Sequence, residues 1–400
     1  MRICLISLTA IEDDPRVRRQ GDALTKAGFD VVAVGTPGGR AAAPSWPVTQ
    51  VPGTRRSLIA KVRTGVTTQP VRLLHAAALP LYWSFKEHRA FLEAALATRA
   101  DVFHANDWRA LPIAARAAGT TGARYVYDSH ELAVEENASS LVWRAVFPHY
   151  VHAIESALVH DAAFVSTVCS GIADIIGTQY ELVDPPLVIR NVPEFVEVGL
   201  SATSVPMTVL YHGVMVRDRG LENLIRSVRM WEGTTRLILR GAGPPSYMTY
   251  LRSLVRDTGV SGRVTFEPPV PPSEVVAAAN RADVGVVAQP VLNAQTKFAL
   301  PNKLFEYVMA GLAVCVPDGG EMAQIVNQYG VGMTCGSASP AEIAAAINAC
   351  SPQHVERFKR ASLLAARQLN WGTESRVLTG AYDRLAAGPS LSMRGWGSAG

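Results

Sequence analysis

The sequence predicts an α/β protein with two Rossmann-like, doubly wound parallel-sheet domains that face each other across a cleft. Its 400 residues exceed what one ordinary core holds, which suggests two domains of about 150–200 residues each. Short apolar segments alternate with helical stretches from end to end, as in parallel sheets covered by helices on both faces. The alternation starts again after a polar stretch at 199–206, where we place a linker. Such sheets bind ligands at the carboxyl ends of their strands, so the cleft is the expected site.

The first half opens on an apolar run that reads as a strand, followed by a helix over 15–27. Gly28 comes directly after this helix, and a glycine there is a common helix end. The predicted strands of this half are 3–8, 31–35, 101–104, 125–128 and 164–168. A segment punctuated by prolines, 187–193, then leads to the linker.

The second half repeats the pattern. Its predicted strands are 207–212, 236–241, 264–267, 284–288 and 313–316, and its predicted helices are 221–231, 247–258, 272–281 and 303–309. A last helix is predicted at 373–385. We therefore place a first domain at 1–198, a second at 199–370 and a flexible Gly- and Ser-rich tail at 388–400.

Composition and charge exclude several classes of protein. The chain is 48% hydrophobic and 18% charged, which is typical of a globular protein rather than a disordered one. Its formal charge of +4 is mild, and no basic helix or aromatic platform accompanies it, so we expect no nucleic-acid partner. The five cysteines lie far apart, which favours buried thiols in a reducing compartment over a metal site.

Targeting and membrane-spanning signals are missing from the sequence. The first ten residues read as a strand and lack the apolar core and cleavage site of a signal peptide. No uncharged run of about 20 apolar residues occurs. We expect a cytoplasmic protein that is able to lie on the inner face of the plasma membrane.

The most informative segment is ALPNKLFEYVMAGL at 299–312. Pro301 and Asn302 lead into a helix whose first turn carries Lys303, where the free amides and the helix dipole favour an anion. A lysine is unusual at that position unless an anion is expected beside it. Glu306 lies one turn further, where its carboxylate could accept hydrogen bonds from the two hydroxyls of a ribose. The alternative is an ordinary surface helix with a solvated lysine and glutamate.

Two further loops follow strands of the second half and point to the same ligand. In YHGVMVRDRGL, Gly213 lets the backbone approach a ligand, and Arg217 and Arg219 could reach a diphosphate. The segment RGAGP at 240–244, which includes Arg240 and Gly241, comes at the end of a predicted strand, and its glycines permit close approach of a flat base or of backbone. The first strand-to-helix loop of the chain contains no glycine, so a dinucleotide fingerprint is absent from its expected place.

Polar clusters end two strands of the first half. They are HANDW at 104–108, which includes Asp107, and DSHE at 128–131, which includes His130 and Glu131. Polar side chains at strand ends are where a doubly wound domain places its active groups. Taken alone, a histidine at a strand end is more often structural. Neither cluster has the spacing of a zinc site, so we predict no metal and no other cofactor.

At ALPNKLFEYVMAGLAV the sequence resembles the retaining glycosyltransferases of family 4, which have the GT-B fold. The resemblance extends to about residue 387 and includes, in the family's order, DVFHANDW, YVYDSHEL, STVCSGIADII, VIRNVPE, YHGVMVRDRGLENLI, LRGAGP and RADVGVV. It implies a hexosyl- or N-acetylhexosaminyltransferase of polysaccharide biosynthesis that takes its donor from a nucleotide-sugar, without a metal and with retention of anomeric configuration. It also implies that the last helix, within 373–387, crosses back to the first domain.

The resemblance also implies roles for single residues. Glu306 holds the donor ribose, Arg219 and the helix start at Asn302 and Lys303 hold the diphosphate, and His130 lies beside the transferred sugar. The residues expected on the donor side are Gly213, Arg217, Arg219, Arg240, Gly241, Pro301, Asn302, Lys303, Leu304 and Glu306. Those expected on the acceptor side are Arg16, Asp107, His130 and Glu131, and the catalytic set is His130, Arg219 and Lys303.

The sequence departs from the family's pattern at three places. Phe298 stands where the first of two glutamates is usual, which puts recognition of the donor sugar in question. Val214 stands where an arginine is usual, which leaves Arg217 or His212 as substitutes. The glycine pair of the first loop is replaced by Asp13, Asp14, Pro15 and Arg16.

The acceptor is a glycan, a lipid-linked intermediate or a small molecule. Residues 55–89 mix Arg and Lys with Leu, Tyr, Trp and Phe, which is typical of a surface that binds anionic lipid, or of an ordinary solvated helical face. Two other functions remain open. One is a sugar-nucleotide 2-epimerase of the same fold, and the other is a non-catalytic subunit that binds nucleotide-sugar.

Overall fold

The computed structural model describes residues 1–39, 41–52, 75–136 and 141–388. The chain divides into two compact units, Met1–Ile189 together with the segment from Ser375 onward, and Arg190–Glu374. The predicted tail lies outside the described residues from 389 on, and so do residues 53–74 of the predicted basic and aromatic surface.

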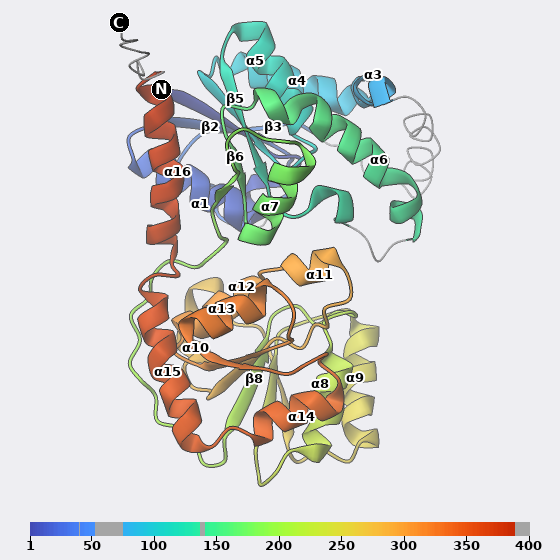
Figure 1. Ribbon diagram of the computed structural model, residues 1–400, viewed down its shortest axis with the longest axis vertical. Coiled ribbons are helices and arrows are strands. Elements are labelled where there is room, and N and C mark those ends of the chain that lie inside the picture. The colour runs from blue at the N-terminus through green and yellow to red at the C-terminus, as the bar shows by residue number, and fades with distance from the viewer. Residues whose placement is uncertain (40, 53–74, 137–140, 389–400) are drawn as a thin grey trace, which may run out of the picture. The chain divides into compact units, whose positions relative to one another are not determined.

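The first unit is built on a seven-stranded parallel sheet in the order β3-β2-β1-β4-β5-β6-β7. Its strands are β1 Arg2–Ile6, β2 Asp30–Gly35, β3 Val48–Gln50, β4 Val102–Asn106, β5 Arg124–Ser129, β6 Val165–Thr167 and β7 Leu187–Val188. Its helices are α1 Pro15–Lys26, α3 Ala78–Trp83, α4 Lys86–Ala97, α5 Leu111–Thr121, α6 Leu141–Leu158, α7 Ser170–Gln179 and most of α16 Trp371–Ala386 (Figure 1). The chain turns back between β1 and β4, so the loops after these strands diverge there.

Helix α16 packs against the first unit through a buried hydrogen bond. The Tyr382 hydroxyl lies 2.7 Å from Nδ1 of His104 in β4, and both side chains are fully buried. Burial lowers the pKa of His104 to about 4, so its ring is neutral. The carboxyl-terminal part of α16 therefore belongs to the core of the first unit.

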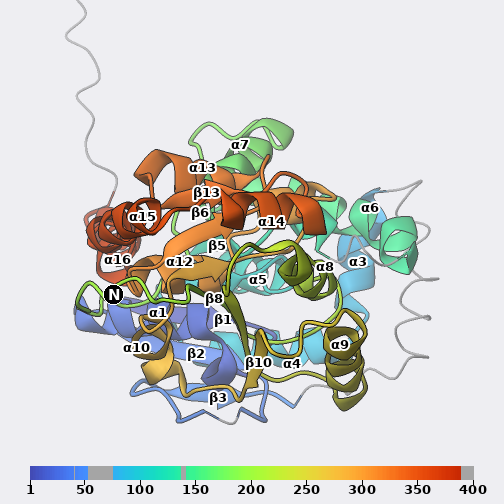
Figure 2. The same ribbon diagram turned by 90° about the horizontal axis from the view of Figure 1, so that it is seen from below.

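The second unit contains a six-stranded parallel sheet in the order β10-β9-β8-β11-β12-β13. Its strands are β8 Thr208–His212, β9 Arg236–Arg240, β10 Val264–Glu267, β11 Val284–Val286, β12 Ala313–Val316 and β13 Gly332–Thr334. Its helices are α8 Leu221–Ser227, α9 Pro245–Asp257, α10 Val275–Ala279, α11 Ala294–Phe298, α12 Asn302–Met309, α13 Glu321–Tyr329, α14 Pro340–Asn348 and α15 Pro352–Ala366. Figures 1 and 2 show α8 and α9 on one side of β8, and α10, α12 and α15 on the other.

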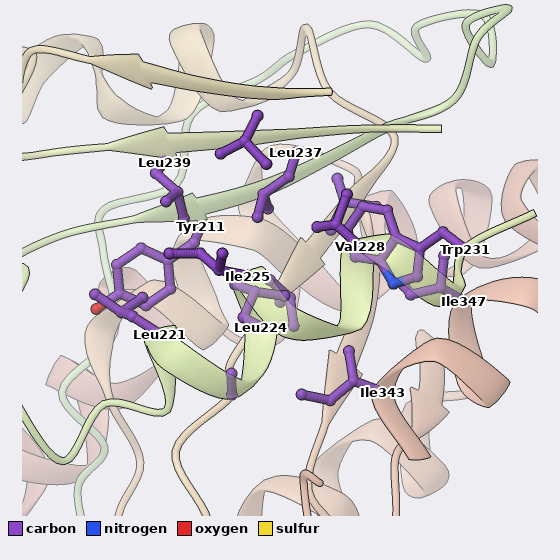
Figure 3. Close-up of a cluster of buried hydrophobic side chains, with 14 of the residues drawn as sticks. Tyr211, Leu221, Leu224, Ile225, Val228, Trp231, Leu237, Leu239, Ile343 and Ile347 are labelled. Atoms are coloured by element: carbon purple, nitrogen blue, oxygen red, sulfur yellow. The ribbon is translucent and has the colours of Figure 1, made fainter. Parts of the chain in front are cut away.

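The core of the second unit lies between the sheet and the layer formed by α8, α9 and α14. Figure 3 shows Leu224 and Ile225 of α8 beneath Leu237 and Leu239 of β9, with Ile343 of α14 closing the cluster. All five side chains are fully buried. Each contributes roughly 1.5–3 kcal/mol by leaving water, which fixes the sheet that carries the loops of this unit.

The structure confirms the predicted fold class and corrects several element boundaries. The helix predicted at 221–231 is α8 followed by a 3-10 turn at Val228–Met230. The helix predicted at 272–281 is a 3-10 turn at Pro272–Glu274 followed by the short α10. Strands β3, β7 and β13 were not predicted. They are two or three residues long and none of their residues is buried, whereas the equally short β6 and β11 are buried throughout and were recognised.

No helix in the described part of the chain is long and apolar enough to cross a bilayer. All five cysteines are free thiols, and four of them are buried. One aromatic residue assigned to the predicted surface at 55–89 needs correction. Tyr82 is only 1% exposed and its hydroxyl donates to the Arg109 carbonyl, so its side chain belongs to the core.

Candidate functional site

The main cluster of predicted site residues lies at the carboxyl edge of the second sheet, beside the neighbouring strands β8 and β11. Strands β9 and β10 extend from β8 in one direction, and β12 and β13 extend from β11 in the other. The loops that follow β8 and β11 therefore diverge, and in doubly wound sheets this is where ligands bind. The loop after β8 carries Gly213 and Arg219, and the loop after β11 leads to Lys303.

Lys303 is a cation without a carboxylate partner among the described residues. Its Nζ lies 3.7 Å from the centre of the Tyr211 ring, a cation–π contact. Its pKa is lowered to about 7, by burial first and by the charge of Arg219 second, while the charge of Glu306 opposes the shift. The charged form of Lys303 is therefore destabilised in the unliganded protein, and a bound anion would stabilise it.

Gly213 gives access to this lysine. Its φ of +119° is a backbone conformation that side-chain-bearing residues rarely adopt, and a Cβ there would lie 3.5 Å from Lys303 Nζ. Gly241 is required for a related reason, because a Cβ on it would lie 2.0 Å from the Gly213 carbonyl oxygen. The two glycines let the ends of β8 and β9 approach closely and leave the flank of Lys303 uncovered.

The two arginines of the loop after β8 have different surroundings. Arg219 donates to the Gln289 side chain at 2.9 Å, which fixes it near Lys303. Arg217 lies 5.4 Å and 5.6 Å from the ring centres of Tyr247 and Tyr250 of α9. The structure therefore brings Arg219 and Lys303 together and places Arg217 over α9.

Glu306 on α12 faces the end of β8. Its Oε2 lies 2.8 Å from Nε2 of His212, and the next residue, Tyr307, accepts a hydrogen bond from the His212 amide at 3.0 Å. The other carboxylate oxygen of Glu306 has no partner among the described residues, and its side chain is 24% exposed. His212, considered from the sequence as a substitute for the usual arginine, instead orients Glu306.

The amino end of α12 has no side-chain cap. Pro301 occupies the capping position, and the first amides of a helix have no partner within it. Asn302 and Lys303 form the first turn. Leu304 is fully buried and its amide donates to the Pro301 carbonyl, so the prediction that Leu304 contacts the donor is corrected to a core position.

Arg240 is also mostly buried, and its side chain pairs with Glu267 of β10. Nε and Nη2 each lie 2.8 Å from Glu267 Oε2. Most of the guanidinium of this residue, which was predicted on the donor side, is therefore engaged by Glu267. The remaining Nη1 is buried without a partner in the described structure.

A second cluster lies at the carboxyl edge of the first sheet, centred on Asp128 at the end of β5. Its carboxylate accepts two hydrogen bonds from Arg16 and one each from Gln20 and Ser166, all at 2.7 Å. His130 Nε2 lies 3.2 Å from the same carboxylate. Burial raises the pKa of Asp128, but the charge and hydrogen bonds of Arg16 outweigh it and hold the pKa well below its usual range.

The Asp128 carboxylate orients the His130 ring and shifts its pKa. Burial lowers its pKa, while the hydrogen bond and charge of Asp128 raise it more, and the result is a raised pKa. Its side chain is 24% exposed, and Nε2 also lies 3.3 Å from the Asn106 side chain. The arrangement favours an imidazolium that donates hydrogen bonds over a free base.

Other residues assigned to the acceptor side have partners of their own. Arg16 is only 3% exposed and also donates to the Ile189 carbonyl, so it orients Asp128 and does not face solvent. Asp107 has a positive φ of 74° and pairs with Arg109, whose guanidinium also binds Glu136. Burial raises the pKa of Asp107, although the charge of Arg109 lowers it. The Glu131 carbonyl accepts from Ser129 at the end of β5.

Some partners in both clusters were not identified from the sequence. Gln20 and Gln289 are single amides on a helix and in a loop, and no local motif marks them. Asp128 was part of a recognised polar cluster, but its role as the centre of that cluster depends on partners far along the chain. No group of three or more His, Cys, Asp or Glu side chains in the described residues has the geometry to hold a metal ion.

Family models match both halves of the chain. Residues 14–191 match the model of a glycosyl transferase 4-like domain, and residues 206–351 match that of the glycosyl transferases group 1. No protein of curated function matched the sequence significantly.

Solved structures share the fold over nearly the whole chain. Sucrose-phosphate synthase from Thermosynechococcus elongatus has a TM-score of 0.73 at 18% identity, covering 97% of this chain and 99% of that one. Anabaena HepE in complex with UDP and glucose has a TM-score of 0.67 at 14% identity, covering 96% and 100%. The lipopolysaccharide outer core galactosyltransferase WaaB has a TM-score of 0.67 at 11% identity, also covering 96% and 100%. At such low identity the likeness establishes the GT-B fold alone.

Proposed function

Because the chain belongs to the glycosyl transferases group 1 family and is a glycosyltransferase of GT-B fold, we propose that it uses a nucleoside-diphosphate-sugar as its donor. The proposed reaction transfers a hexosyl or N-acetylhexosaminyl group to an acceptor, with retention of anomeric configuration and without a metal. The observation that supports this donor most directly is Lys303, a partly desolvated cation without a carboxylate partner beside Arg219.

The diphosphate is the natural anion for this cluster. A diphosphate oxygen near Lys303 would also lie near the amino end of α12, where the helix dipole and free amides favour negative charge. Arg219 adds several donors from the opposite loop. Two cations and a helix end supply the charge neutralisation that a divalent ion supplies in other transferases, which is why we propose metal independence.

Glu306 is the proposed contact for the ribose. A carboxylate with one oxygen held by His212 and one free accepts hydrogen bonds from vicinal hydroxyls and repels phosphate. The negative charge of Glu306 therefore favours the ribose of the donor at this position and disfavours the diphosphate.

In the proposed step, the bond between the anomeric carbon and the diphosphate oxygen breaks while a bond forms from the acceptor oxygen on the same face of the sugar. The acceptor proton passes to the departing phosphate oxygen. Lys303 and Arg219 stabilise the charge that develops on the leaving diphosphate, and one well-placed donor of this kind is worth about 3–4 kcal/mol. His130, kept protonated by Asp128, is the proposed hydrogen-bond donor to the transferred sugar.

The acceptor is proposed to be a glycan or a lipid-linked intermediate of polysaccharide biosynthesis. WaaB, which shares the fold, is a lipopolysaccharide galactosyltransferase, and this supports such an acceptor. We propose a cytoplasmic location with contact to anionic lipid through 55–89. Flotation with liposomes that contain or lack anionic lipid tests the contact, and equal recovery in both would contradict it.

The donor is tested by thermal shift with UDP-, GDP- and dTDP-sugars, followed by turnover of the stabilising donor with and without EDTA. HepE was solved with UDP, so UDP-sugars come first. Lys303→Ala should lose roughly two orders of magnitude in turnover. The matched control is Lys26→Ala, an exposed lysine at the end of α1. Full turnover by Lys303→Ala would refute the assignment, and epimer formation from donor alone would indicate an epimerase.

A further inference from the structure

A row of polar side chains crosses three neighbouring strands beside the proposed diphosphate site. In the sheet register, His212 of β8 is paired with Arg240 of β9, and Arg240 is paired with Glu267 of β10. Residues paired in this way on parallel strands point to the same face of the sheet. The row therefore continues from Glu306 through His212 and Arg240 to Glu267.

Arg240 and Glu267 form the outer pair of this row, in which the arginine is buried and the glutamate is partly exposed. The Arg240 side chain is 9% exposed and holds Glu267 Oε2 through Nε and Nη2, each at 2.8 Å. The Glu267 side chain is 34% exposed, and its other oxygen has no partner among the described residues. A buried guanidinium thus presents a charged carboxylate to solvent at the edge of the sheet.

The row is incomplete in its hydrogen bonds. Arg240 Nη1 and His212 Nδ1 are both buried without a partner in the part of the chain that the structure describes. Buried polar atoms are nearly always hydrogen-bonded in folded proteins, so two unmatched atoms on adjacent strands leave this row with capacity for a further hydrogen-bond partner.

The charge and the spacing identify what binds there. Glu267 repels phosphate and accepts hydrogen bonds from N–H groups. Two strand spacings, about 10 Å, separate β8 from β10, so the base of a nucleoside whose ribose lies at Glu306 would extend along the row toward Glu267. Resting on the nucleotide-sugar donor proposed above, with the ribose at Glu306, we propose that Glu267 reads the nucleobase and that Arg240 is the positioning residue that holds it.

The chemistry of this pair selects among the bases. Uracil, thymine and guanine carry a ring N–H beside a carbonyl, so the N–H donates to Glu267 while the carbonyl lies toward the cation of Arg240. Adenine and cytosine present a ring nitrogen lone pair at that position, which a carboxylate repels. The pair therefore favours UDP, dTDP or GDP over ADP and CDP, by about 10-fold or more for a well-made two-point contact.

The test is calorimetric binding of UDP, dTDP, GDP, ADP, CDP and pyrophosphate to the full chain. Wild type is expected to bind at least one of UDP, dTDP and GDP about 10-fold more tightly than ADP and CDP. Glu267→Gln replaces the carboxylate by an amide that both donates and accepts, so it should reduce the preference several-fold and leave pyrophosphate affinity undiminished. Glu232→Gln, an exposed carboxylate of the same unit, is the matched control and should change nothing.

A second variant guards against misfolding, since Glu267→Gln leaves Arg240 without its charged partner. Arg240→Met combined with Glu267→Leu removes both charges and fills their volume, which is often neutral for stability. It too should lose the base preference. Unchanged base ranking in both variants, or wild-type affinity for ADP and CDP equal to the best of the others, would overturn the base-reading assignment. Failure of every nucleotide and of pyrophosphate to bind wild type would instead overturn the proposed donor.

Discussion

The ammonium of Lys303 lies 3.7 Å from the centre of the Tyr211 ring and forms no ion pair with a carboxylate of the described residues. The ring face offsets only part of the cost of desolvating a charge. The consequence is a pKa near 7, caused by burial first and by Arg219 second. Lys303 therefore lowers the stability of the unliganded protein, and its replacement by a neutral side chain should raise that stability.

We expect Lys303→Met to raise thermal stability while it abolishes high-affinity donor binding. The cost of the buried charge is fully present below pH 7 and fades as the pH rises toward the unfolded-state value of about 10.4. The gain in melting temperature should therefore be largest below pH 7. Differential scanning fluorimetry across pH measures it, with Lys26→Met as the control that should not shift. A lower melting temperature for Lys303→Met below pH 7 would show that the lysine is a structural residue.

Donor binding should take up a proton at alkaline pH. Above pH 7 the free lysine is mostly neutral, and a bound diphosphate favours the ammonium, so the pKa of Lys303 rises on binding. Calorimetry at pH 8 in two buffers of different ionisation enthalpy should show uptake of close to one proton. Lys303→Arg stays charged throughout and should show none. Identical heats in both buffers for wild type would contradict the assigned titration.

The fold class could be predicted from the sequence because the alternation of strands and helices repeats along both halves. It also located the β8 loop and the α12 start, since glycine, lysine and glutamate stand at strand and helix ends where their types have meaning. It missed β13, in which Gly332 and Thr334 leave no apolar run to recognise. A short strand is recognised from sequence only when its residues form a buried apolar run, as they do in β11.

Partners distant in sequence set the chemistry of the candidate sites, and this is where prediction from one sequence failed. Arg16 was predicted on the acceptor side, but its partner in the fold is the carboxylate of Asp128, which lies 112 residues away in the sequence. Arg240 was predicted on the donor side, and the pairing of β9 with β10 places Glu267 beside it. In both cases a buried charge requires a partner of opposite charge, and that partner is brought beside it only by the tertiary fold.

Asp128→Asn should destabilise the first unit strongly. The amide cannot accept all the hydrogen bonds that the carboxylate receives, and it leaves the buried Arg16 uncompensated, at a cost of about 3–5 kcal/mol. Urea unfolding measures this cost. Asp30→Asn is the control, because its pair with Arg2 is 43% and 58% exposed and is worth less than about 1 kcal/mol.

The pH dependence of the same variant gives an independent check. Since the folded pKa of Asp128 is lowered, its contribution is present above the unfolded value of about 3.9 and is lost as the pH falls through the folded value. The gap between wild type and Asp128→Asn should narrow in acid. A gap that stays constant down to pH 2 would mean that packing, and not charge, causes the loss.

His130→Gln should separate catalysis from donor affinity. The side chain belongs to the first unit and is held by Asp128, whereas the proposed diphosphate and ribose contacts lie in the second. We therefore expect kcat to fall by about 100-fold while the affinity for the nucleoside diphosphate stays within two-fold. The raised pKa of His130 also adds stability that is present below about pH 6.5 and is lost as the pH rises through the folded value. Wild type should consequently lose more stability than His130→Gln as the pH rises above 6.5, measured by urea unfolding. An equal loss in the two proteins would show that Asp128 does not hold His130 in its protonated form.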